Sequence, residues 1–167
     1  YVMGNQKTRN RKQTTRMNVI NVIGGTKNQR KLAEKIAWFC IKDMMPRYRT
    51  LDIEIQLRNC MKENKQLGCC YDLGTNREFV IEVEKSLYKK DLDDFARTIC
   101  HEMIHVWQTA SKIMKDSSDG QKFWKGKNGK YKNYTDTEYA HQPWEHQAYS
   151  LQDKLLEQFK EYYYGNK

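Results

Sequence analysis

Residues 91–110 read DLDDFARTICHEMIHVWQTA, and this stretch decides the fold class. Apolar side chains recur in it at three- and four-residue steps, which is the period of an amphipathic helix. Asp91 can cap the start of such a helix, and acidic residues in the first turn suit its dipole. We therefore predict a helix from Asp91 to about Met114, with one apolar stripe facing the core. The stripe consists of Leu92, Phe95, Ile99, Met103, Val106 and Ala110.

The same helix carries the sequence His101-Glu102-Met103-Ile104-His105. Residues four apart share one face of a helix, so His101 and His105 can direct imidazole nitrogens at a single metal ion. At about 100° per residue, both histidines project almost opposite the apolar stripe. A catalytic zinc takes three protein ligands and leaves one position for water. Glu102 is placed to take a proton from that water and pass it to a leaving amine.

A third metal ligand has to come from outside this helix. Three candidates lie near the start of a later helix that begins close to Pro143: His141, Glu145 and His146. We prefer Glu145, because neighbouring apolar residues anchor that helix in the core beside it. Glu145 could instead be only a first-turn glutamate that the helix dipole favours. In that case His141 is the alternative third ligand.

The rest of the chain predicts an α+β fold in one domain. Strands are expected over residues 17–23, 51–57, 68–73 and 79–83, and a helix between Thr26 and Pro46. A hairpin insertion is expected at about 121–134, turning on Asn128-Gly129. Together these elements predict one domain over residues 17–167. In it, a small antiparallel or mixed sheet packs on the motif helix, and a further helix follows at the C-terminus. Residues 1–16 contain five cations and no apolar period, which predicts a flexible basic arm.

Composition limits the class of protein. The chain has 167 residues, of which 38% are hydrophobic, enough for one compact core. It has no run of about 18 apolar residues and no apolar segment of a secretory signal in its first twenty residues, so we predict no membrane partner. Five cysteines, an odd number, favour the reducing cytoplasm. The net charge of +9 suits nucleic acid, but the cations look scattered and locally balanced beyond the arm.

The order of a helix, short strands and the helix with His101-Glu102-Met103-Ile104-His105 resembles the SprT-like metallopeptidases of bacteria and phages. The likeness covers about residues 26–115, and it implies a minimal zincin core. The later stretch Pro143-Trp144-Glu145-His146-Gln147-Ala148 is similar to a Pro-Trp-Glu-x-x-Ala pattern of short zincin-type proteins. The resemblance also implies that the chain could be a phage protein that acts inside a bacterial host.

The resemblance also bears on the third ligand. Metzincins would need glycine at 108 and histidine at 111, where this chain has Gln108 and Ser111. SprT-like proteins take a third histidine soon after the motif helix, whereas the next one here is His141. The comparison favours a site of gluzincin type, in which Glu145 of a later helix completes the ligand set.

Two further features are implied by the resemblance. A strand at the sheet edge, expected at 79–83, would pair with an extended substrate above the metal. A side chain would also donate a hydrogen bond to the transition state, and the candidates are Tyr139, His141 and Tyr149.

The sequence therefore predicts a metallopeptidase with one catalytic Zn²⁺ held by His101, His105 and Glu145, with Glu102 as general base. Its expected partner is a protein or peptide substrate, and no oligomeric state is predicted. One alternative is a SprT-like protease that acts on protein crosslinked to DNA, with the basic arm binding DNA. Another is a module with a structural zinc that binds DNA or protein without catalysis.

Overall fold

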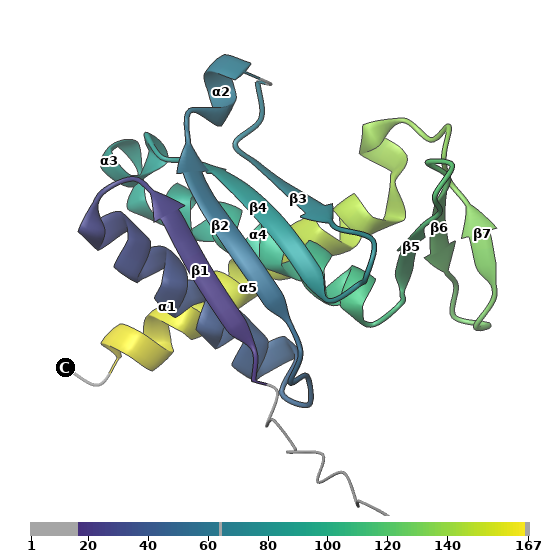
Figure 1. Cartoon of the computed structure of the whole chain (residues 1–167), viewed down its shortest axis with the longest axis horizontal. Helices are drawn as coiled ribbons and strands as arrows, with labels where there is room; N and C mark the ends of the chain where they lie inside the picture. Colours follow the sequence, from purple (N-terminus) through teal and green to yellow (C-terminus); the bar gives the residue numbers. More distant parts are fainter. Residues whose placement is uncertain (1–16, 64, 166–167) are drawn as a thin grey trace, which may run out of the picture.

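The computed structural model describes residues 17–63 and 65–165 (Figure 1). Four strands form a mixed sheet in the order β1 (Val19–Gly24), β2 (Asp52–Arg58), β4 (Glu78–Glu84) and β3 (Gly68–Asp72). The first three are parallel, and β3 runs antiparallel to β4 at the edge. The predicted α+β class and the small mixed sheet are confirmed. The basic arm predicted at 1–16 lies outside the described residues.

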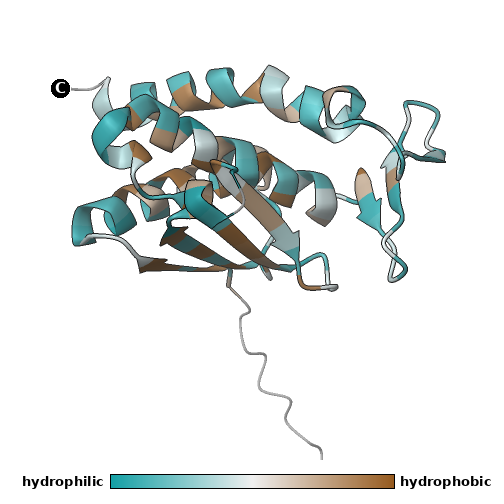
Figure 2. Ribbon diagram, turned by 90° about the horizontal axis from the view of Figure 1, so that it is seen from above, coloured by the Kyte–Doolittle hydropathy of each residue, from teal (hydrophilic) through white to brown (hydrophobic). Residues whose placement is uncertain are grey.

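Three long helices cover one face of this sheet. Helices α1 (Lys27–Met44) and α4 (Leu92–Ala110) lie against the sheet, and α5 (Pro143–Tyr164) packs on α4 on the side away from it (Figure 2). The remaining helices are short: α2 (Cys60–Glu63), α3 (Leu87–Lys90) and the 3-10 turn η1 (Tyr139–His141). This layering puts α4 in the middle of the molecule, between the sheet and α5.

Local sequence accounts for the elements that hold α4 in place. Thr26 caps α1 in a capping box with Gln29, which ends the preceding turn and starts the helix. In β2 the alternate residues Ile53, Ile55 and Leu57 are buried, as their period of two predicts. These side chains face the helices, so the core lies between the sheet and the helical layer.

Helix α4 follows the prediction at its start and departs from it at its end. The Asp91 side chain accepts a hydrogen bond from the Asp94 backbone N–H, so the predicted cap is confirmed. Of the predicted apolar stripe, all members are buried except Leu92, which is 49% exposed in the first turn. The helix ends at Ala110 rather than near Met114, because Lys112 adopts a left-handed conformation with φ +60° and the chain turns into a strand.

A second, three-stranded antiparallel sheet follows α4. It consists of β5 (Met114–Asp116), β6 (Lys122–Lys125) and β7 (Tyr131–Asn133), and Figure 1 shows it beyond the C-terminal end of α4. Strands β6 and β7 pair as the hairpin expected at 121–134, with Gly129 at φ +77° in the turn. A turn at residues 111–113 replaces the last turn of the predicted helix, and β5 begins at Met114.

Two further observations concern the chain as a whole. None of the helices in the described part of the chain is long and apolar enough to cross a membrane. All five cysteines are thiols, and Cys40, Cys60 and Cys100 are buried. The cytoplasmic location stays a prediction.

Candidate metal centre

Two turns of α4 and the first turn of α5 bring three possible metal ligands together. His101, His105 and Glu145 each offer one ligand atom, and these atoms all lie within 4.8 Å of one another. The Nε2 atoms of His101 and His105 are 3.1 Å apart. The Glu145 carboxylate oxygens lie 3.2 Å from His101 Nε2 and 3.4 Å from His105 Nε2. His101 and Glu145 are buried, and His105 is half-buried. The residues predicted as the ligand set therefore form one cluster.

These separations fit a zinc ion. Nitrogen and oxygen ligands at about 2.0–2.2 Å from zinc, at tetrahedral angles, lie about 3.3 Å from one another. The three observed separations fall on either side of that value. Two imidazoles and a carboxylate are also a common protein ligand set for catalytic zinc.

The outer nitrogens of both histidines are held by glutamine side chains. His105 Nδ1 lies 2.8 Å from the Gln108 amide oxygen, and His101 Nδ1 lies 2.9 Å from that of Gln152. The amide nitrogen of Gln108 donates to the Trp144 carbonyl, which fixes its oxygen toward His105. An amide oxygen only accepts, so His105 carries its proton on Nδ1 when neutral and turns the lone pair of Nε2 toward His101. Two ring nitrogens approach this closely when a metal ion or a proton lies between them.

The Glu145 carboxyl is kept ionised by its surroundings. Burial alone would raise its pKa, but hydrogen bonds with His101 and His105 outweigh this effect and lower the pKa well below its usual range. The Tyr139 hydroxyl adds a further hydrogen bond of 2.7 Å to Oε2. The pKa of His105 is raised. Burial by itself would lower it, but the carboxyls of Glu145 and Glu102 have the larger combined effect. Glu145 is therefore in the charged form that binds a cation.

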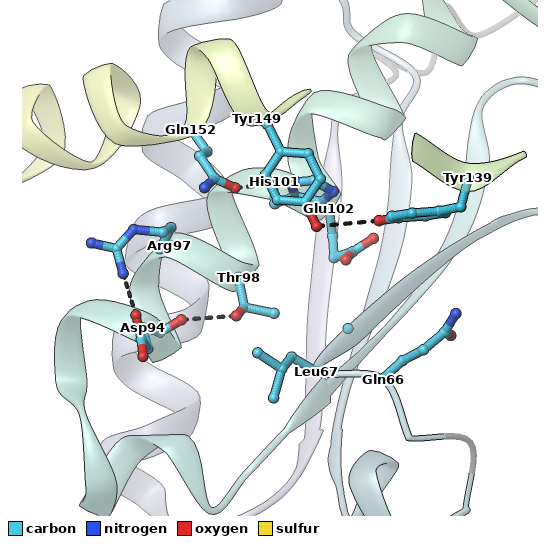
Figure 3. A pocket seen from close by; sticks show the side chains of 11 residues that line it. Gln66, Leu67, Asp94, Arg97, Thr98, His101, Glu102, Tyr139, Tyr149 and Gln152 are labelled. Carbon is cyan, nitrogen blue, oxygen red and sulfur yellow. Dashed lines mark hydrogen bonds and ion pairs between the residues drawn. The ribbon is translucent and has the colours of Figure 1, made fainter. Parts of the chain in front are cut away.

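Glu102 lies beside the three ligands but outside the cluster. It is 5% exposed, and burial raises its pKa to about 7, with a smaller opposing effect of the two histidines. A carboxyl with this pKa can both accept and release a proton near neutral pH. Figure 3 shows its side chain pointing into the recess between Tyr139 and the segment that leads into β3.

Gly68, the first residue of β3, makes room for this carboxyl. A Cβ atom at position 68 would lie 2.6 Å from Glu102 Oε1 and 2.8 Å from the methyl group of Thr98. Both distances are shorter than real Cβ contacts, so any side chain here would displace Glu102 or the strand. The strand edge and the carboxyl are thus fitted to each other.

Two connected recesses open at the centre. One, of about 430 Å³, lies toward the start of α4 and is lined by Leu67, Thr98, Tyr149 and Gln152 among others (Figure 3). The other, of about 270 Å³, exposes the ligand cluster and is lined on one side by β3. Glu102 lines both, so it stands where the two recesses meet.

Strand β3, rather than residues 79–83, forms the sheet edge beside these recesses. The expectation of an edge at 79–83 is wrong, because β4 lies between β2 and β3. Leu67 and Leu73 make their backbone hydrogen bonds with β4. Since alternate residues of a strand point opposite ways, Gly68, Cys70 and Asp72 direct their N–H and C=O groups away from β4. These groups lie where an extended chain would pair with the sheet.

The other predicted site residues lie at different distances from the cluster. The hydroxyls of Tyr139 and Tyr149 are 3.3 Å apart, and the ring of Tyr149 is 4.8 Å from that of His101. Burial and the hydrogen bonds with Tyr149 and Glu145 raise the pKa of Tyr139, so its hydroxyl stays protonated. His141 is exposed on η1 and is not part of the cluster.

Sequence reasoning missed the residues that hold the ligands in place. Gln152 stands seven residues after Glu145 and Tyr149 four after it, a spacing that puts all three on one face of α5. Gln108 stands three residues after His105, which is also neighbour spacing on a helix. Both signals were present in the sequence. The role of Gly68 was not detectable, since it depends on which strand lies against Glu102.

Comparisons of the chain with protein-family profiles, with curated proteins and with solved structures gave no match.

Proposed function

We propose that this chain is a zinc-dependent metallopeptidase in which His101, His105 and Glu145 hold the ion. The observation that carries this proposal is the convergence of two imidazole nitrogens and a carboxylate at separations of 3.1–3.4 Å, beside a buried carboxyl. Zinc bound there would supply Lewis acidity, which lowers the pKa of water and polarises a carbonyl group.

The side chains around the ion have distinct tasks in this mechanism. Glu102 takes the proton from the attacking water onto its carboxylate and then delivers it to the nitrogen of the leaving amine. Its pKa of about 7 suits both transfers. The Tyr139 hydroxyl, which donates to Glu145 Oε2 at 2.7 Å, would turn from that carboxylate to donate to the oxyanion that forms on the carbonyl oxygen. Gln108 and Gln152 keep the imidazole rings oriented.

Substrate binding follows from the strand edge. The outward N–H and C=O groups of Gly68 and Cys70 would pair with an extended peptide and bring one of its bonds under Glu102. The mixed sheet, its antiparallel edge strand and the adjacent motif helix support a zincin-like arrangement as part of this proposal.

Metal analysis combined with matched variants tests the proposal. The purified protein should contain one zinc per chain and cleave peptides in a mixed library, with cleavage abolished by a chelator and restored by zinc. Glu102→Gln should keep the zinc and lose cleavage, whereas Glu145→Ala should lose zinc affinity. If the zinc is only structural, Glu102→Gln and the wild type should give the same result in every assay, cleavage included. Full zinc affinity in Glu145→Ala would remove Glu145 from the ligand set.

A further inference from the structure

Residues 112–134, which contain the second sheet and its turns, concentrate positive charge; we call this segment the lysine-rich sheet. It holds seven lysines and two acidic residues. With the five cations of residues 1–16, it accounts for more than the entire net charge of +9, so the rest of the chain is close to neutral. The expectation of cations scattered and balanced beyond the arm is wrong for this segment. The lysines are Lys112, Lys115, Lys122, Lys125, Lys127, Lys130 and Lys132.

Little within the described part of the chain balances this charge. Of these seven lysines, only Lys122 forms an ion pair with a described residue, and its partner is Asp116 at 3.1 Å. The other six lysines are exposed. Like charges this dense repel one another, so seven lysines beside only two acidic residues favour an anionic partner from outside.

The lysine-rich sheet adjoins the proposed substrate cleft. Met114 and Lys122 line the same recess as His105 and Glu145. The β5–β6–β7 register puts Lys122 and Lys132 on the face that carries Met114. In Figure 1 this sheet lies beyond the end of β3, so a chain extended along β3 would continue onto it. Substrate residues several positions away from the cleaved bond would therefore contact the lysine-rich sheet.

The aromatic rings of the sheet indicate which anion fits. Single-stranded nucleic acid binds to exposed rings on which bases stack. Here Lys115 and Lys125 each lie 5.9 Å from the centre of the Tyr131 ring, and Lys132 lies 5.1 Å from that of Tyr134. The Tyr131 hydroxyl also donates to the Lys112 carbonyl. Ammonium groups already lie over these two rings, which leaves less ring surface for bases to stack on and favours an acidic peptide over single-stranded nucleic acid.

We propose that the lysine-rich sheet binds an acidic segment of the protein whose chain enters the cleft along β3. This inference rests on the proposed peptidase function, since it names the substrate class of the same site. Its consequence is a preference for substrates with a run of Asp or Glu on one side of the cleaved bond. Because the contacts are exposed, the preference should weaken as salt is added.

The test compares two peptides that differ only in charge. A cleavable core found in a mixed library is extended, at either end, by a block of glutamates or by a block of glutamines. We expect kcat/KM to be about tenfold higher for one acidic peptide than for its glutamine counterpart at low salt. In Lys115→Glu/Lys125→Glu/Lys132→Glu, which reverses Lys132 on the face of Met114 and two lysines on the opposite face, this ratio should fall to about one, or below it. The matched control reverses three exposed lysines on α1 and α3, Lys27→Glu/Lys31→Glu/Lys89→Glu, and should keep the ratio.

Binding measured by fluorescence anisotropy on the same peptides separates this inference from the proposed function. Cleavage without any charge preference overturns the inference and leaves the peptidase standing. If no peptide is cleaved, the glutamate and glutamine blocks are joined to one uncharged core instead, and tighter binding of the acidic peptide, lost in the triple variant, still supports the surface. Absence of both cleavage and binding overturns both proposals. An oligothymidylate or a DNA duplex of equal charge that binds more than tenfold tighter than the acidic peptide also overturns the inference, in favour of nucleic acid. Triple Lys→Gln replacement repeats the test if the reversed variant does not fold.

Discussion

The metal centre and the lysine-rich sheet are both polar, but they handle charge in opposite ways. In the centre, His101, His105 and Glu145 are held by neighbours within hydrogen-bond distance, and the carboxyls of Glu145 and Glu102 are buried. In the lysine-rich sheet, six of seven lysines are exposed without an ion pair in the described part of the chain. Buried, mutually held groups keep one geometry, which chemistry requires. Exposed single charges steer a partner without fixing its position.

This contrast makes the centre sensitive to small displacements, and Gly68→Ala tests that with the largest expected effect. The added Cβ would lie 2.6 Å from Glu102 Oε1, so the carboxyl has to move. A general base displaced by about 1 Å costs about 100-fold in kcat. Zinc content should stay at one per chain, because no ligand is touched. Cys69→Ala, the next position on the same strand and on its opposite face, is the control, and equal kcat in the two variants would refute a positioning role for Gly68.

The burial of Glu102 should also be visible in the stability of the chelated protein. Burial raises its pKa to about 7 in the folded state, against about 4.3 in an unfolded chain. Between these pH values the folded protein holds a proton that the unfolded chain has released, so stability falls as the pH rises through this window. Glu102→Gln cannot ionise, and should be about 2–4 kcal/mol more stable than the wild type at pH 8.

Urea unfolding in the presence of a chelator measures this difference. The advantage of Glu102→Gln should shrink toward zero near pH 4.5, where the wild-type carboxyl is protonated in the folded protein. Glu78→Gln, at an exposed position on β4, should stay within about 0.5 kcal/mol of the wild type at both pH values. A difference that does not change with pH would mean that ionisation of Glu102 is not its cause.

The next expected effect concerns the support of the ligands. Gln108→Leu keeps the volume but leaves the His105 Nδ1 proton and the Trp144 carbonyl without their partner. We expect a loss of about 1–3 kcal/mol in the free energy of unfolding and a 10- to 100-fold loss in zinc affinity. Gln147→Leu removes only the outer hydrogen bond of the same network, to Gln108 Nε2. Competition with a zinc indicator should show near-normal affinity for that variant, and an equal loss in both would mean that orientation of His105 is not what Gln108 supplies.

The two regions also differ in how much the sequence revealed of them. Periodicity and capping were sufficient for α1, α4 and α5, because a helix records its buried face every three or four residues. The spacing of His101 and His105 fixed two ligand candidates in advance. Glu145 had to be chosen among neighbours, since its place depends on how α5 packs across α4. Strand order depends on contacts between distant segments, so the sequence alone does not show that β3 rather than residues 79–83 forms the sheet edge.

The smallest expected effect lies in the lysine-rich sheet, where single replacements should hardly alter stability. Lys125→Gln and Lys132→Gln each remove an exposed ammonium near a tyrosine ring, at 5.9 Å and 5.1 Å from its centre. An exposed contact of this kind contributes about 0.5–1 kcal/mol, and relief of repulsion among the neighbouring lysines offsets part of it. Unfolding free energies should therefore stay within about 0.5 kcal/mol of the wild type. A loss above about 1 kcal/mol would show that these lysines are needed to fold the sheet, and their charge would then no longer point to a partner.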